Sequence, residues 1–150
     1  MLPRDTSAPS LDQQAADLTS SEARLAAAGH TLTAQRRAIL RFLAARTDHP
    51  TATVIYEAVT RDFPISSRAT VYNTLSLLVE LGMVTTVLGG EEVRYDPNLA
   101  PHHHLRCERC GALQDIPAED VTVYRGGVPA EGRVEFRGQC EACAADSATT

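Results

Sequence analysis

Residues 96–115 read DPNLAPHHHLRCERCGALQD, and this stretch decides how the chain is organised. Cys107 and Cys110 form a Cys-x-x-Cys pair, and a second pair, Cys140 and Cys143, lies near the end of the chain. Two residues between thiolates let one turn present both sulfurs to a tetrahedral ion, and the repeated pair has the spacing of structural zinc sites. The sequence therefore predicts one closed zinc site that stabilises a small module.

The same stretch carries nitrogen and oxygen donors. His102 and His104 alternate on a predicted strand, so both point to one face while His103 points away. Asp96 and Asp115 flank them, and strand pairing would bring Asp115 beside the two imidazoles. These donors suit an ion of higher coordination number than zinc, such as Fe2+ or Mn2+. The alternative is a solvated polar strand that binds no ion.

The composition is that of a soluble protein from a reducing compartment. No apolar run among the 150 residues approaches the roughly 20 residues of a membrane span. All four cysteines belong to the two pairs, which without a signal peptide indicates metal thiolates in the cytoplasm and not disulfides. Residues 1–18 are polar, have no apolar signal region and are predicted to form a disordered tail.

The charge distribution permits contact with DNA. The formal net charge is −5, which does not by itself indicate nucleic-acid binding. Between Thr19 and Met83, however, seven arginines stand against five acidic residues, a local net charge of +2. A mildly basic N-terminal half on an acidic protein is compatible with a DNA-binding domain there.

Short helices followed by a hairpin are predicted in the N-terminal half. Thr19 and Glu22 form a capping box for a first helix that ends near Gly29. Ser66 or Ser67 opens the fourth helix. This is the order of a winged-helix domain, whose last helix enters the major groove. The other expected elements are helices at 33–46 and 51–63, a fourth helix ending at 82, and hairpin strands at 83–88 and 92–95.

The fourth helix has a candidate DNA-contact face. Arg68, Tyr72 and Asn73 lie together on its outer side. We expect Arg68 to reach a phosphate or a guanine, and Tyr72 to pack on a thymine methyl group. Arg36 on the second helix is expected to contact the DNA backbone or to be solvated. Exposed helix faces also carry such residues when they bind nothing.

The predicted secondary structure changes after residue 96, from helices and a hairpin to short strands. Strands are expected at 102–106, 112–116 and 133–137, forming a small α/β unit with a cysteine pair at each end. Residues 117–132 are poorly determined, and 118–124 fit either a short helix or another strand. The predicted fold class is α+β, with a tail at 1–18, a winged-helix domain at 19–95 and a small α/β domain at 96–146.

Five motifs occur along the chain in a fixed order. They are TLTAQR at 31–36, HPTA at 49–52, RATVYNTL at 68–75, HxHxxCxxCG at 102–111 and CxxC at 140–143. Together they resemble the ferric uptake regulator (Fur) family over about residues 20–143. The resemblance implies a homodimeric, metal-dependent transcriptional repressor and not an enzyme. It would have a winged-helix domain that binds a palindromic double-stranded operator, and a C-terminal dimerisation domain.

The resemblance also implies a role for individual residues. Asp96 and Asp115, where iron-sensing members tend to carry glutamate, are most similar to the peroxide-sensing branch. His49 and His102 match the positions that are oxidised in that branch. The structural zinc ligands of the family match Cys107, Cys110, Cys140 and Cys143. The ligands of its regulatory Fe2+ or Mn2+ match His49, Asp96, His102, His104 and Asp115, and its DNA-binding motifs include Arg36, Arg68, Thr70, Tyr72 and Asn73.

A peroxide-sensing mechanism follows from the resemblance. Metal binding would join the two domains in a DNA-competent shape, and peroxide would oxidise a ligand histidine and release the operator. The alternatives are an Fe2+- or Mn2+-responsive uptake regulator without this reaction, a metalloenzyme, and a metal buffer that never binds DNA. The chain departs from the family between Cys110 and Cys140, where 29 residues replace a longer segment with a helix.

Overall fold

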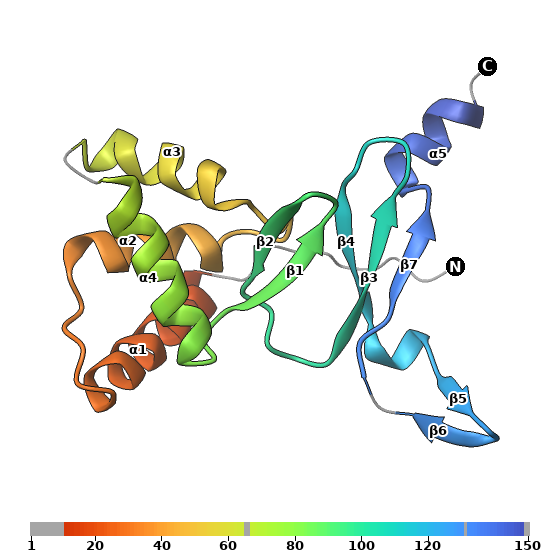
Figure 1. Ribbon diagram of the computed structural model, residues 1–150, viewed down its shortest axis with the longest axis horizontal. Helices are drawn as coiled ribbons and strands as arrows, with labels where there is room; N and C mark the ends of the chain where they lie inside the picture. Colours follow the sequence, from red (N-terminus) through yellow and green to blue (C-terminus); the bar gives the residue numbers. More distant parts are fainter. Residues whose placement is uncertain (1–10, 65–66, 131, 149–150) are drawn as a thin grey trace. The chain divides into compact units, whose positions relative to one another are not determined.

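The computed structural model describes residues 11–64, 67–130 and 132–148, and its chain divides into two units (Figure 1). Within these described residues, the first unit consists of 11–88 and 92–99, and the second of 89–91 and the part from 100 onward. Helices and strands occur in both, which confirms the predicted α+β class. The described residues hold no helix with the length and apolar character needed to cross a bilayer. The domain limits at 19, 96 and 146 stay a prediction.

The first helix starts earlier than the sequence predicts. Helix α1 runs from Leu11 to Ala27, so Thr19 lies inside the helix and does not cap it. Residues 11–18 read LDQQAADL, and the helix propensity of Ala, Leu and Gln outweighs the polar composition that suggested a tail. The remaining part of the predicted tail, residues 1–10, lies outside the described residues.

The next three helices begin where the sequence predicts. Thr33, Thr51 and Ser67 are their N-caps, and each side-chain oxygen accepts a bond from the backbone N–H three residues on. Ser66, the other candidate cap for the last of them, lies outside the described residues. The helices are α2 (Ala34–Ala44), α3 (Ala52–Asp62) and α4 (Arg68–Glu80).

Helices α1 to α4 share one hydrophobic core. Each contributes at least one side chain with no exposed surface. Burying one such side chain contributes about 1.5–3 kcal/mol, so this core is sufficient to hold α4 in a fixed position. These side chains are Leu25, Ile39, Ile55, Leu75 and Leu78.

Helix α4 ends in a turn that requires glycine. Gly82 has φ +63°, and the N–H of the following Met83 donates to the carbonyl of Leu78 at 2.9 Å. Arg24 of α1 closes the same end by donating to the carbonyl of Leu81 at 2.7 Å. A Cβ at Gly82 would meet only the Arg24 guanidinium, at 3.8 Å. A side chain at this position would therefore destabilise the protein through its positive φ and not through a steric clash.

Replacing Gly82 with alanine should destabilise the first unit by about 1–2 kcal/mol, because an L-residue is disfavoured in the left-handed conformation. Urea unfolding followed by circular dichroism measures the loss. Ser76→Ala, at an exposed position of the same helix, is the matched control and should change stability by less than about 0.5 kcal/mol. Equal stability of the two variants would contradict the role given to Gly82.

A two-stranded hairpin follows α4 and fixes the loop before α3. The hairpin consists of β1 (Thr85–Gly89) and β2 (Glu92–Asp96). The N–H of Tyr95 in β2 donates to the carbonyl of Pro50 at 2.9 Å, and Thr51 forms a β-bridge with Arg94. The predicted hairpin is therefore present, and it holds the loop that contains His49.

The second unit is built on a three-stranded sheet with the order β4-β3-β7. Strand β3 (His102–Cys107) pairs antiparallel with β4 (Leu113–Pro117) and parallel with β7 (Glu135–Gly138). The register places His104 directly opposite Asp115. A final helix, α5 (Glu141–Ala148), follows the sheet. All three predicted strands are observed within two residues of their expected positions.

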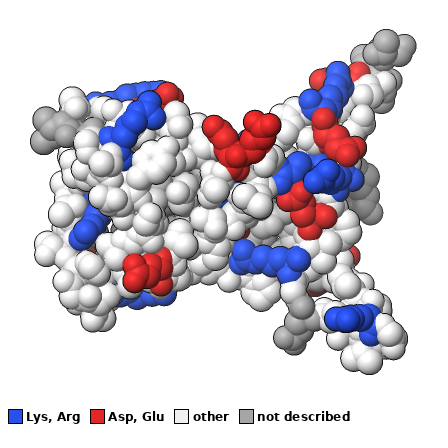
Figure 2. All heavy atoms as spheres, in the orientation of Figure 1, with Lys and Arg blue, Asp and Glu red and all other residues white. Residues whose placement is uncertain are grey.

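The segment that the sequence left open contains both kinds of structure. A single turn of 3-10 helix, η1 (Ala118–Asp120), precedes a small hairpin of β5 (Val123–Arg125) and β6 (Val128–Ala130). Figure 2 shows acidic and basic side chains close together over the second unit. Arg106 of β3 forms an ion pair with Glu135 of the neighbouring strand β7 at 2.6 Å.

Candidate metal centres

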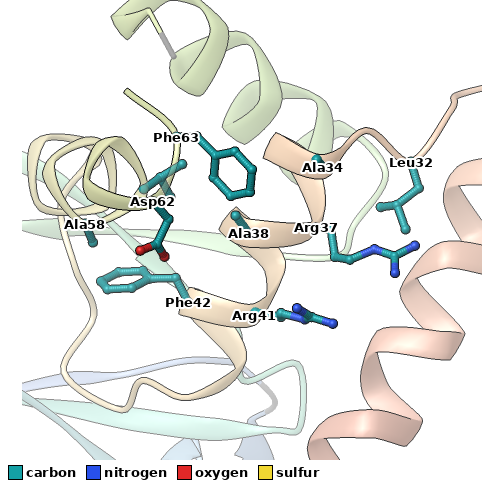
Figure 3. A pocket seen from close by; sticks show the side chains of 10 residues that line it. Leu32, Ala34, Arg37, Ala38, Arg41, Phe42, Ala58, Asp62 and Phe63 are labelled. Atoms are coloured by element: carbon teal, nitrogen blue, oxygen red, sulfur yellow. The ribbon is translucent and has the colours of Figure 1, made fainter. Parts of the chain in front are cut away.

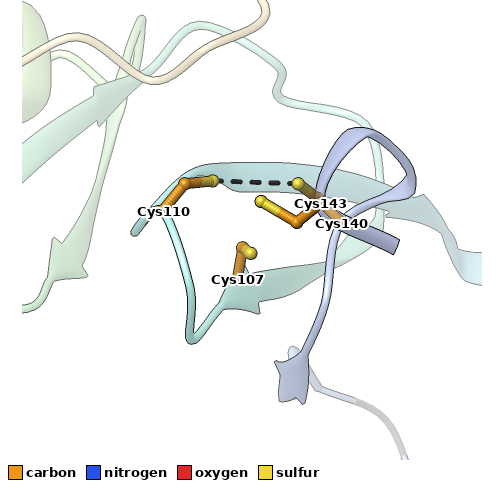
Figure 4. Close-up of side chains that lie close together, drawn as sticks. All are labelled: Cys107, Cys110, Cys140 and Cys143. Atoms are coloured by element: carbon orange, nitrogen blue, oxygen red, sulfur yellow. Dashed lines mark hydrogen bonds between the residues drawn. The ribbon is translucent and has the colours of Figure 1, made fainter. Parts of the chain in front are cut away.

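The four cysteines lie together at one end of the second unit (Figure 4). Cys107 ends β3 and Cys110 follows in the turn, while Cys140 and Cys143 lie at the start of α5. All four sulfurs are within 4.8 Å of one another, and those of Cys110 and Cys140 are 3.7 Å apart. A tetrahedral zinc ion, about 2.3 Å from each sulfur, holds its ligands about 3.8 Å apart. The cluster therefore has the dimensions of a zinc site.

The electrostatics of the cluster favour a cation. Backbone hydrogen bonds from Cys140 and Cys110 lower the pKa of Cys107 to about 6, because N–H donors stabilise its thiolate. The pKa of Cys143 is raised to about 12, first by its hydrogen bond with Cys140 and then by burial. Four sulfurs this close cannot all be ionised without a positive charge between them. A divalent ion removes that restriction and explains why these thiols are gathered.

The backbone around the cysteines holds both pairs in place. Gly111, with φ +74°, lets the chain turn back after Cys110, and its N–H donates to the carbonyl of Cys107 at 2.9 Å. Arg109 reaches across to α5 and donates to the carbonyl of Cys143 at 2.9 Å. One pair is thus linked to the other by protein contacts as well as by the sulfurs.

A second donor set lies on β3 and β4 of the same unit. The Nε2 atoms of His102 and His104 face each other at 3.0 Å, and the carboxylate of Asp115 lies 3.6 Å and 3.7 Å from them. Both histidines are buried, whereas Asp115 is 30% exposed. His103 points to the other side of the strand and accepts a hydrogen bond from the N–H of Val134 at 3.1 Å. The predicted alternation is therefore observed.

A backbone carbonyl orients the first of these histidines. The Nδ1 atom of His102 lies 2.7 Å from the carbonyl oxygen of Ala100. A carbonyl only accepts, so Nδ1 carries the proton and Nε2 keeps its lone pair for a ligand bond. This contact was not predicted, because no residue type in the sequence indicates which carbonyl will face an imidazole.

The first unit holds a third set of donors, the pair His49 and Asp96. His49 is 2% exposed, and its Nε2 lies 3.9 Å from Oδ1 of the buried Asp96. That distance exceeds a hydrogen bond, yet two ligands each about 2.1 Å from one ion can be 3–4 Å apart. His49 also has φ +53°, a conformation uncommon for a residue with a side chain and frequent at functional sites.

The residues predicted to contact DNA have different local roles. Tyr72 and Asn73 are exposed on α4, as expected. Thr70 instead belongs to the N-cap, where its hydroxyl lies 2.9 Å from that of Ser67. Arg36 donates to the carbonyl of Thr31 at 2.7 Å, which stabilises the entry to α2. For Thr70 and Arg36, DNA contact stays a prediction beside these structural roles.

A groove on the first unit is separate from these donors. It lies between α2 and α3, has a volume of about 650 Å3, and is lined on its apolar side by residues such as Phe42 and Phe63 (Figure 3). Arg37, Arg41 and Asp62 form its polar side. It is lined by no histidine or cysteine, so it does not resemble a transition-metal site.

The fold and the donor sets can be compared with known proteins. The model of the "Ferric uptake regulator family" matches residues 27–135. The peroxide-responsive repressor PerR of Staphylococcus aureus is 43% identical over 101 residues, which cover 67% of this chain and 68% of that protein.

Two solved structures are similar to this chain. The Campylobacter jejuni peroxide stress regulator has a TM-score of 0.60 and 26% identity, and covers 90% of this chain and 100% of its own. A zinc-bound manganese uptake regulator has a TM-score of 0.65 and 25% identity, and covers 79% of this chain and 97% of its own. The chain belongs to the ferric uptake regulator family.

Proposed function

We propose that this protein is a metal-dependent transcriptional repressor that senses peroxide in the cytoplasm. Membership of the family already makes it a metal-responsive regulator and not an enzyme. The proposal of a regulatory metal site that senses peroxide depends on one observation. Two imidazole nitrogens and a carboxylate, from His102, His104 and Asp115, lie 3.0–3.7 Å from one another. The name of the relative from S. aureus supports it.

In this proposal the two metal sites have separate tasks. Zinc held by the four cysteines is structural, because four thiolates leave no position for another ligand. The regulatory Fe2+ or Mn2+ takes the imidazoles of His49, His102 and His104 and the carboxylates of Asp96 and Asp115. Five nitrogen and oxygen donors suit these ions and leave a sixth position.

The regulatory ion would control DNA binding because its proposed ligands come from both units. His49 and Asp96 belong to the first unit, and the other three ligands to the second. An ion that takes all five restricts the units to one arrangement, which is differential binding to one of two states. We propose that the restricted arrangement is the one in which two copies of the chain bind a palindromic operator.

Peroxide would end this state by altering a ligand. Fe2+ held by these residues would supply the electron chemistry that activates peroxide, whereas Mn2+ would leave the ligands unoxidised. The net change inserts one peroxide oxygen into a ring C–H bond of His49 or His102 and releases the other oxygen as water. A ring altered in this way would be a weaker donor, so the remaining ligands would hold the ion less tightly and the operator would be released.

Intact-mass analysis after anaerobic Fe2+ loading and a peroxide pulse tests the reaction. We expect one added oxygen, and peptide mapping should place it on the peptide of His49 or His102. The Mn2+-loaded protein is the matched sample and should gain none. The His30 peptide is an internal control for nonspecific oxidation. An unmodified Fe2+ sample would remove peroxide sensing from the proposal.

A second candidate is a manganese- or iron-responsive regulator without the oxidation. The likeness to the zinc-bound manganese uptake regulator, with a TM-score of 0.65 and 25% identity, favours it. Gel shifts with Mn2+, with Fe2+, and with Fe2+ plus peroxide separate the two. Binding that survives peroxide supports the second candidate, and no binding with either metal would exclude both.

A further inference from the structure

Two arginines of the first unit lie over aromatic rings. The guanidinium of Arg68, the first residue of α4, lies 4.6 Å from the ring centre of Tyr56 on α3. That of Arg46 lies 5.1 Å from the ring centre of Phe42. Stacking of this kind stabilises a guanidinium over the ring face and leaves its N–H edge free to donate.

The two arginines differ in what occupies that edge. Arg46 directs two nitrogens at the carboxylate of Asp48, and its Nε donates to Oδ1 at 2.7 Å. Within the described residues, Arg68 has no carboxylate within ion-pair distance, and its side chain is exposed. Arg46 is therefore paired with a neighbouring carboxylate, whereas Arg68 is exposed and has no such partner among the described residues.

The position of Arg68 is not explained by the stability of α4. The first turn of this helix contains no acidic residue, and a cation at a helix N-terminus is disfavoured by the helix dipole. Tyr56 is half-buried and packs against the core of the first unit, so its ring is a fixed surface. The contact with Tyr56 therefore holds the Arg68 guanidinium at the N-terminus of α4, where the helix dipole disfavours a cation. This position indicates that Arg68 has a function other than stabilising the helix.

We propose that Tyr56 is a positioning residue that fixes Arg68 to read a guanine in the operator. This inference rests on the proposed function, because it requires that α4 binds DNA. Residues at the N-terminal end of a recognition helix contact base edges, and Arg68 lies one turn before the exposed Tyr72 on that helix. The fork of Arg68 matches the O6 and N7 acceptors of guanine. The stack limits the rotamers that the free side chain would otherwise sample.

Binding of the Mn2+-loaded full-length protein to an operator selected from random duplexes tests this. Arg68→Ala should weaken binding about tenfold or more and relax the preference at one guanine. Tyr56→Leu should weaken it about two- to fivefold. Tyr56→Phe keeps the ring and should restore wild-type affinity. The double variant Tyr56→Leu/Arg68→Ala should bind no more weakly than Arg68→Ala alone. Phe42→Leu removes the other stack and is the matched control.

Each outcome has one meaning. Failure of the wild type to bind any duplex would contradict the proposed function itself. Wild-type binding together with additive losses in the double variant, or equal losses for Tyr56→Phe and Tyr56→Leu, would overturn the positioning role of Tyr56. The alternative outcome is that Arg68→Ala weakens binding to all sequences equally and lowers the slope of log affinity against log salt concentration by about one. That result would show that Arg68 contacts a phosphate, and the proposed contact with guanine would be wrong. Thermal unfolding of Tyr56→Leu confirms that the variant is folded.

Discussion

Replacing Cys140 with serine should abolish zinc binding and unfold the second unit. Among the described residues of this unit, the buried apolar side chains are three of the cysteines and Leu113. Structural zinc sites bind their ion with about 10–16 kcal/mol, and whole domains are stable by only about 5–15 kcal/mol. A sheet of three short strands with so small a core cannot replace that contribution.

Zinc content measured by plasma mass spectrometry, together with the thermal unfolding curve, checks this prediction. We expect about one zinc per chain in the wild type and none in Cys140→Ser, with loss of the unfolding transition of the second unit. Ala144→Ser introduces the same residue at an exposed position of α5 and should keep both the zinc and the transition. A zinc-free variant that still unfolds cooperatively at the wild-type temperature would show that the cysteines do not hold the fold.

The His49→Asn variant should lose the stimulation of DNA binding by Mn2+ while it keeps its zinc and its fold. Asparagine tolerates the positive φ of this residue, but its amide is a poor substitute for an imidazole ligand. Loss of the ligand should lower Mn2+ affinity at least as much as loss of an outer-shell partner, which is about 10- to 100-fold. The variant thus separates metal binding from backbone strain.

Titration with Mn2+, followed by anisotropy of a labelled operator, measures the effect. His104→Ala should give the same loss, because the proposal assigns both imidazoles to one ion. His30→Asn, on the turn before α2, is the matched histidine control and should behave as the wild type. If His104→Ala lowers Mn2+ affinity while His49→Asn does not, the two donor sets do not share an ion.

The sequence predicted those elements whose signals are local. The helix starts at 33 and 51, and the start of the fourth helix at Ser66 or Ser67, follow from local signals, because a hydroxyl three residues before a free N–H is visible in the chain itself. The alternation of His102 and His104 was likewise a local pattern, and the register that places Asp115 opposite His104 followed from pairing two adjacent strands.

What the sequence could not provide depends on contacts between distant segments. The stack of Arg68 on Tyr56 joins two helices, and nothing in either helix alone indicates it. The early start of α1 was missed for another reason: a polar stretch of good helix formers looks the same whether it is helical or unstructured.

The small β5–β6 hairpin has a consequence for how the second unit varies in length. It lies within the 29 residues between Cys110 and Cys140, so it is part of a loop whose ends are joined at the sulfurs. The entropy of closing such a loop changes with the logarithm of its length, and doubling the loop costs only about 0.6 kcal/mol. Insertions and deletions at this hairpin should therefore change the stability of the second unit only slightly, so long as the two cysteine pairs are retained.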